Sequence, residues 1–153
     1  MIITSGLKHG IATPYPLVGL ASLGHTAATA LGATYDWGTN APQAVLVVLT
    51  VTFAANPPGN GYLKLVAAPS ADGTTFGHFN GGLDLGACRA AQWVCPAYAA
   101  TPYTEVFTCE LGGIYPGGIP PRYQKLAVVN ESGVGLAGAS LALVEIFERA
   151  VPA

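Results

Sequence analysis

Charged residues are scarce in this chain of 153 residues. Aspartate, glutamate, lysine and arginine make up 9% of the sequence, whereas hydrophobic residues make up 51%. A typical soluble domain carries about 25% charged residues. Abundant alanine and glycine explain part of the apolar fraction but not the missing lysine and glutamate. We therefore expect other subunits to cover much of the surface, as in a homo-oligomer or a lattice.

Basic residues and long apolar runs are both in short supply. The six basic residues are Lys8, Lys64, Arg89, Arg122, Lys125 and Arg149. They form no stripe and the net charge is −2, so we expect no nucleic-acid partner. No apolar segment approaches the ~20 residues that span a bilayer, so we expect no membrane partner. Pro14 and Pro16 interrupt the N-terminal segment, which argues against a signal peptide.

Cysteine is limited to Cys88, Cys95 and Cys109. An odd count in a chain without a predicted signal peptide indicates reduced thiols, and buried free thiols are the favoured interpretation. Cys88 and Cys95 lie seven residues apart around Trp93, so a disulfide between them in an oxidising medium is the alternative. The histidines show no zinc-ligand spacing to these cysteines, and we predict no metal site.

The sequence is rich in β-strand pattern, most clearly over residues 44–53. One face of this segment consists of Val45, Val47, Leu49, Val51 and Phe53. The opposite face consists of Leu46, Val48, Thr50 and Thr52. The first face is typical of a core, but a free monomer would carry charge on the second. We therefore expect the second face to be covered, either by more of the chain or by a neighbouring subunit.

Further strands are separated by turns rich in glycine and proline. Alternation predicts strands at residues 61–68, 104–111, 123–130 and 141–149. We expect residues 61–68 to pair with residues 44–53 as an antiparallel hairpin. We expect residues 87–102 to form a loop or a short strand. Almost no helix is indicated. The sequence thus predicts one all-β domain over residues 35–153, an antiparallel β-sandwich of jelly-roll-like type.

The first part of the chain has little periodicity. We expect an extended N-terminal arm over residues 1–34 that reaches a neighbouring subunit. Aromatic side chains in loops are further candidate anchors, because tyrosine and tryptophan are enriched at protein contacts. The candidate interface residues are Leu17, Leu20, Leu46, Val48, Trp37, Trp93, Tyr98 and Tyr115.

Catalytic patterns are weak throughout. A triad could combine His25 or His78 with Asp72 or Asp84, but the chain has no G-x-S-x-G nucleophile elbow. A small hydrolase that uses His78 is therefore the weaker alternative. Asp72-Gly73-Thr74-Thr75 lacks the rest of a calcium loop, and a turn explains it.

Two acid pairs, Glu105/Glu110 and Glu145/Glu148, are better explained as solvated or interface residues on strands than as glycosidase carboxylates. We accordingly predict no catalytic, cofactor-binding or metal-ligating residue in this chain.

Two segments carry a resemblance to a known group of proteins. The first contains Ser70, Asp72, Gly73, Thr74, Thr75 and Phe76. The second contains Pro120, Arg122, Tyr123, Val128, Asn130, Ser132, Gly133 and Leu136. Together with the strands around them, they resemble small tailed-bacteriophage virion structural proteins, decoration or minor-capsid-like, in which a "SxDGtTY"-like turn precedes an "lPxrw-i-V-N-sG-aL" segment. The resemblance covers about the last two-thirds of the chain, and residues 82–101 depart from it.

The resemblance implies a non-enzymatic β-sandwich protein of the virion, assembled in the host cytoplasm. We expect a capsid decoration or cement protein whose partners are the major capsid protein, other virion proteins and further copies of itself. The alternative is a tail or fibre-associated component that contacts host-surface glycans through aromatic residues such as Trp93 and Tyr115. The shared motifs are turn chemistry, and no catalytic residue can be transferred from them.

Overall fold

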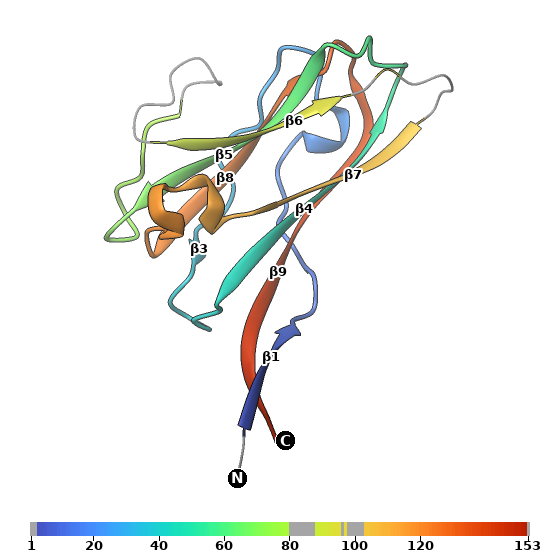
Figure 1. Ribbon diagram of the computed structural model, residues 1–153. Helices are drawn as coiled ribbons and strands as arrows, with labels where there is room; N and C mark the ends of the chain where they lie inside the picture. The colour runs from blue at the N-terminus through green and yellow to red at the C-terminus, as the bar shows by residue number, and fades with distance from the viewer. Residues whose placement is uncertain (1–2, 80–87, 96, 98–102, 153) are drawn as a thin grey trace.

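Two antiparallel sheets pack face to face in the computed structural model, which describes residues 3–79, 88–95, 97 and 103–152 (Figure 1). Among these residues the only helical segments are the 3-10 turns η1 (Leu20–Ser22), η2 (Gly112–Ile114) and η3 (Pro116–Gly118). None of them could span a membrane, since none is long and apolar enough. The prediction of an all-β sandwich is confirmed.

The larger sheet has five strands. These are β1 (Ile3–His9), β2 (Thr13–Pro14), β4 (Ala44–Phe53), β7 (Tyr103–Glu110) and β9 (Leu136–Pro152). Their order is β1-β9-β4-β7, and β2 pairs with β9 as well. The smaller sheet has four strands, β3 (Tyr35–Asp36), β5 (Gly61–Ser70), β6 (Arg89–Cys95) and β8 (Tyr123–Glu131). Their order is β3-β8-β5-β6.

The core lies between the two sheets and follows the alternation read from the sequence. All five predicted core residues of β4 are fully buried, and they face leucine, alanine and valine side chains of β5 and β8. β4 has the predicted bounds, and β5, β7 and β8 lie within two residues of theirs. The segment 87–102 includes a true strand, β6, and the final strand is longer than the sequence predicted.

The predicted hairpin between residues 44–53 and 61–68 is wrong. β4 pairs with β7 and β9, whereas β5 pairs with β6 and β8 in the other sheet. The segment between them therefore crosses from one sheet to the other. Both strands present an apolar face to the same core, so their alternation is equally compatible with pairing and with packing across a sandwich. The turn after β8 likewise crosses between sheets, to β9.

Residues 10–37, here called the strap, close one side of the sandwich. The strap first runs along β9, where the amide of Tyr15 donates to the Leu141 carbonyl at 2.8 Å. It then crosses to β8, where the amide of Thr29 donates to the Val128 carbonyl at 2.9 Å. Since one segment bonds to a strand of each sheet, the strap ties the two sheets together.

The strap corrects the prediction of a separate arm over residues 1–34. Tyr15, Leu17, Leu20 and Leu23 all belong to the buried core of the sandwich. The Tyr15 hydroxyl donates to the Ala33 carbonyl and accepts from the Leu126 amide at 2.9 Å. The domain therefore begins well before residue 35, because these side chains lose their solvent exposure against the chain's own sheets.

A pair of strands extends beyond the body. β1 pairs with the last part of β9, from Ile3 opposite Pro152 to His9 opposite Ile146. β1 and residues 146–152 of β9, here together called the ribbon, project from the sandwich, and both chain termini lie at the tip of the ribbon (Figure 1).

Candidate interaction surface

The outer face of the five-stranded sheet is the largest regular surface that the sequence pattern singled out. Residues directly opposite in a ladder point to the same side of a sheet, so the registers define this face. It consists of Leu46, Val48, Thr50 and Thr52 of β4, Thr104, Val106, Thr108 and Glu110 of β7, and Gly138, Ser140, Ala142 and Val144 of β9. We call these twelve residues the outer face.

The outer face carries almost no charge. Glu110 is its single ionisable residue, and the other eleven are aliphatic, glycine or hydroxyl residues. Hydroxyl groups partly satisfy one another: the Oγ1 atoms of Thr52 and Thr104 lie 2.8 Å apart across the strands. A sheet face of this composition costs little to desolvate, which suits a flat protein contact.

None of the described segments covers this face. Every residue of β4 on it is partly exposed, and Val106 is 53% exposed. The other sheet differs, because Ala28 and Leu31 of the strap together with Phe76 and Phe79 pack over its outer side. From the sequence, two possibilities remained for what covers the second face of β4: more of the same chain or a neighbouring subunit. Among the described residues the chain's own segments do not supply such a cover.

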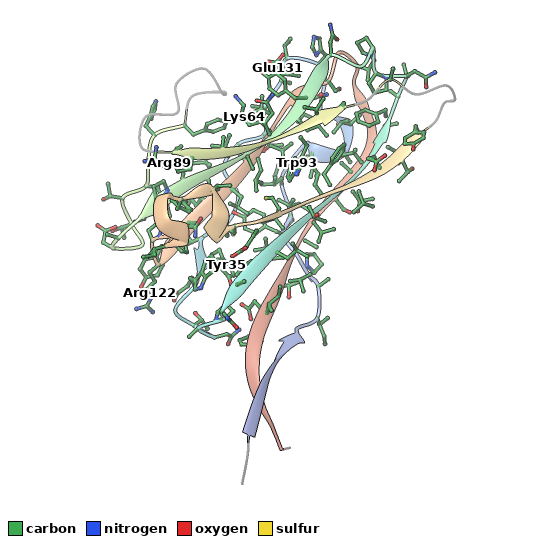
Figure 2. The ribbon with its side chains drawn as sticks, viewed as in Figure 1. Tyr35, Lys64, Arg89, Trp93, Arg122 and Glu131 are labelled. Carbon is green, nitrogen blue, oxygen red and sulfur yellow. The ribbon has the colours of Figure 1, made fainter. Side chains whose placement is uncertain are left out.

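The basic residues of the sandwich body belong to the smaller sheet and its turns, together with the carboxylates of Asp36 and Glu131. Outside the ribbon, the basic residues are Lys64 on β5, Arg89 on β6, Lys125 on β8 and Arg122 just before β8 (Figure 2). The five-stranded sheet within the sandwich body contributes only carboxylates, Glu105, Glu110 and Glu145. The two sheets of the body therefore differ in that basic residues belong to the smaller one.

Five of the predicted interface residues are engaged within their own domain. Leu17, Leu20 and Tyr115 have less than a tenth of their surface exposed, which contradicts their assignment as interface residues. Tyr115 is held by its hydroxyl, which donates to Gln124 Oε1 at 2.8 Å. Burial raises the pKa of this tyrosine. Since these side chains complete the chain's own core, they are not available to a partner.

Both tryptophans are half-buried and donate their indole N–H groups to the backbone. Trp93 Nε1 donates to the Thr108 carbonyl at 3.0 Å, and its ring lies 5.8 Å from that of Phe107 (Figure 2). Trp93 thus links β6 to β7, which are the end strands of the two sheets. Trp37 Nε1 donates to the Pro42 carbonyl at 3.1 Å. Tyr98 lies outside the described residues. Leu46 and Val48 are therefore the predicted interface residues that the structure leaves on a free face.

The residues considered for catalysis are not brought together. His25 Nδ1 accepts the Gly133 amide at 3.1 Å, and among the described residues neither His25 nor His78 contacts a carboxylate. Asp72 Oδ1 accepts from Ser70, Thr74 and Thr75 within its own turn, as the turn interpretation predicted. These hydrogen bonds hold the pKa of Asp72 well below its usual range. Asp84 lies outside the described residues.

The acid pairs do not converge either. Glu105 and Glu110 are five residues apart on one strand, and Glu145 and Glu148 are three apart on another, so the members of each pair are on opposite faces. Glu145 accepts hydrogen bonds from Tyr35 at 2.9 Å and Asn40 at 3.0 Å beside a cavity of 300 Å³. Within the described part of the chain, no cluster of three or more His, Cys, Asp or Glu side chains is arranged to hold a metal.

Cys88, Cys95 and Cys109 form no disulfide with one another, and Cys88 and Cys95 are buried. β6 separates these two residues by an extended run of about 23 Å at ~3.3 Å per residue. Because a disulfide requires Cα atoms within roughly 7 Å of each other, the two cannot pair within one chain. Burial raises the pKa of Cys95 and of Cys109 to about 11, so neither is an activated nucleophile.

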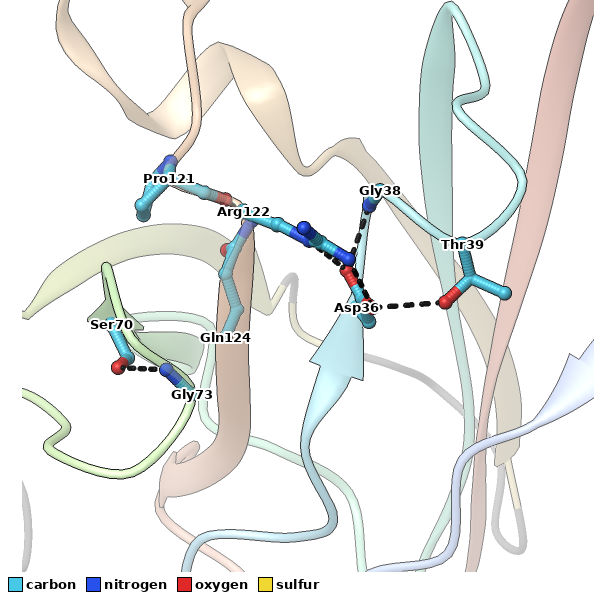
Figure 3. A network of polar contacts seen from close by, with 8 residues as sticks. All are labelled: Asp36, Gly38, Thr39, Ser70, Gly73, Pro121, Arg122 and Gln124. Atoms are coloured by element: carbon cyan, nitrogen blue, oxygen red, sulfur yellow. Dashed lines mark hydrogen bonds and ion pairs between the residues drawn. The ribbon is translucent and has the colours of Figure 1, made fainter.

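The motif residues behind the resemblance hold turns and crossovers in place. Arg122 Nε donates to Asp36 Oδ1 at 2.8 Å, and Ser70 Oγ accepts the Gly73 amide at 3.0 Å (Figure 3). Asn130 Nδ2 donates to the Leu23 carbonyl at 3.1 Å, which fastens the strap to β8. These residues specify the fold and carry no evident chemistry of their own.

Comparison with family models, with curated proteins and with solved structures finds no match for this chain.

Proposed function

We propose that this chain is a non-enzymatic structural protein that works by docking the outer face of its five-stranded sheet onto other proteins of an assembly. The observation that carries the proposal is the uncovered outer face, with one ionisable residue in twelve. Low overall charge, 9% of the sequence, supports the same conclusion. The resemblance of residues 70–76 and 120–136 to virion proteins makes a bacteriophage particle the proposed assembly, with the chain as a decoration or cement protein.

The size of the outer face bears on how it would be used. Three strands of about seven residues cover roughly 400 Å², given ~3.4 Å per residue, ~4.8 Å between strands and the width of the side chains. A stable pairwise interface usually needs about 800 Å² from each partner. The outer face alone would therefore give a weak contact. Repetition over many copies on a lattice would raise the effective affinity, as a cement protein requires.

The glycan-binding alternative finds less support. Its named aromatic residues were Trp93 and Tyr115, and a sugar-stacking residue must present an open ring face. Tyr115 is 8% exposed, and Trp93 packs against Phe107 with its indole N–H already donated. We therefore propose a protein partner and not a host-surface glycan.

Virion membership is tested by purification of particles from the phage that encodes the chain. On a density gradient, the chain should co-sediment with virions in a constant number of copies per particle and should remain after a salt wash, because apolar contacts are not screened by salt. Recovery of the chain only in the soluble fraction of the infected cell would contradict the proposal.

A further inference from the structure

The ribbon is a two-stranded extension of the larger sheet. β4 begins at Ala44, opposite Ile146, so β9 has no neighbour on that side from residue 147 onward. Beyond this point β1 is the only strand beside β9 among the described residues. The ribbon consequently stands clear of the sandwich (Figure 1).

Two strands by themselves are a poor structure in water. An isolated two-stranded ribbon is marginally stable at best, and three or more strands or a packing partner are needed for independent stability. Within the described part of the chain the ribbon has no third strand. A further strand along one of its edges would supply what it lacks.

The backbone identifies which groups on β1 are free to pair. The amide of Gly10 donates to the Glu145 carbonyl, at the point where the ribbon joins the body. In an antiparallel ladder, residues whose N–H and C=O groups bond to the neighbouring strand alternate with residues whose groups point the other way. Every second residue back from Gly10 therefore bonds to β9, and the backbone groups of the residues between them point away from β9. The residues with outward N–H and C=O groups are Ile3, Ser5, Leu7 and His9.

We propose that β1 pairs antiparallel with β1 of a second copy, about a two-fold axis at Gly6. This register sets Ile3 opposite His9 and Ser5 opposite Leu7, so every outward residue meets an outward residue of the other copy. All seven residues of β1 are paired. The product is a continuous four-stranded sheet of order β9-β1-β1-β9, in which neither ribbon is left with two strands.

A second copy suits this edge because the contact is isologous. The same strand serves both partners, and a two-fold axis closes the assembly at a dimer. Lys8, the charged residue of β1, is set opposite Thr4 and not opposite another Lys8, so no like charges are placed in a directly facing pair. β1 contains no proline, which would otherwise block an edge.

The test is the mass of the full chain in solution, by analytical ultracentrifugation over a dilution series. The wild type should reach twice the 15.5 kDa of one chain. Ser5→Pro removes one outward N–H group and leaves the bonds to β9, so it should be monomeric. Ser5→Ala keeps the N–H group and should dimerise as the wild type does. A monomeric wild type, or a dimeric Ser5→Pro, would overturn the proposal.

The register has a test of its own. A residue on the two-fold axis faces itself across a non-hydrogen-bonded pair, with Cα atoms about 4.5 Å apart, which is within disulfide range. Gly6→Cys should therefore form a cross-chain disulfide under mild oxidation, whereas Ser5→Cys, opposite Leu7, should not. Equal cross-linking of both variants, or none of Gly6→Cys, would exclude this register.

This inference is separate from the proposed docking role. A substitution on the outer face, such as Val48→Lys, should leave the dimer intact, and Ser5→Pro should leave the outer face unchanged. Failure of one proposal is therefore distinguishable from failure of the other.

Discussion

Individual polar side chains hold this fold together at points where the backbone is irregular. Among the described residues, no buried side-chain nitrogen or oxygen lacks a hydrogen-bond partner. Tyr15 serves two backbone groups with one hydroxyl, and Asn130 joins the strap to the crossover after β8. Since a buried polar group without a partner costs about 1–3 kcal/mol, each of these residues is a point of measurable stability.

Tyr15→Phe should destabilise the protein by about 1–3 kcal/mol, because the Leu126 amide would lose its buried acceptor. Urea unfolding followed by circular dichroism measures the change. Tyr62→Phe is the matched control: Tyr62 is half-exposed, and its substitution should change the free energy of unfolding by less than about 0.5 kcal/mol. Equal effects of the two substitutions would show that the Tyr15 hydroxyl has no special role.

Asp36 gives the fold an acid-sensitive contact. The hydrogen bond that Asp36 accepts from Arg122 is the main reason why the pKa of Asp36 is lowered from 3.8 to about 2. A carboxylate whose pKa is lower in the folded state stabilises it above the unfolded pKa, and the contribution is lost as the pH falls through the folded pKa. The wild type should therefore have a higher melting temperature than Asp36→Asn at pH 5, and the difference should shrink between about pH 4 and pH 2. A difference that is independent of pH would contradict this account.

Thiol reactivity reports the burial of the cysteines. Because burial raises the pKa of Cys95 and Cys109 to about 11, few of these thiols are ionised near neutral pH. Alkylation by iodoacetamide should be slow in the native protein and fast in urea, as followed by mass spectrometry. Fast native alkylation of Cys95 would mean that the side of the sandwich closed by Trp93 opens readily.

The bounds of single strands could be predicted from the sequence, whereas the pairing of those strands could not. Strict alternation predicted β4 at its observed bounds, because one fully apolar face leaves no other register. The assignment of β4 and β5 to different sheets could not be read from the sequence, since it depends on pairings between residues far apart in the chain. The strap was taken for an arm because its apolar residues follow neither the two-residue period of a strand nor a sustained helical period.

A local signal in the strap could have corrected the prediction. Leu17, Leu20 and Leu23 are spaced three residues apart and closely follow Tyr15, and all four lie in the core. Apolar residues at such regular intervals in a segment with many glycines and prolines indicate burial even where no strand or helix is predicted. The outer-face residues Leu46 and Val48 were found because their pattern departs from that of an ordinary exposed face.

Truncation separates the strap from the ribbon. Removal of residues 1–34 should abolish cooperative unfolding, because it deletes four core side chains and the hydrogen bonds that join the two sheets. Removal of residues 1–9 deletes only β1 and should leave the sandwich body folded. Thermal melts by circular dichroism compare the two. A cooperative melt after removal of residues 1–34 would show that the strap is dispensable.

The whole molecule is a sandwich with two unlike sides. One outer side is covered by the strap and by Phe76 and Phe79, and it lies on the half of the molecule with the basic residues. The opposite side is almost uncharged and is left uncovered by the described residues, and the ribbon extends from the same sheet. Such an arrangement suits a subunit that presents one face to an assembly. The shortage of charged residues noted in the sequence is most evident on that face, which has one ionisable residue among twelve.

The most direct test of the docking surface is binding of the purified chain to phage particles that lack it, measured as copies per particle. Val48→Lys puts a charge in the middle of the outer face and should lower the affinity by at least about tenfold, or roughly 1.4 kcal/mol. Ala71→Lys, which adds the same charge on an exposed turn after β5, should bind as the wild type does. Equal occupancy by all three proteins, with unchanged melting temperatures, would contradict a docking role for the outer face.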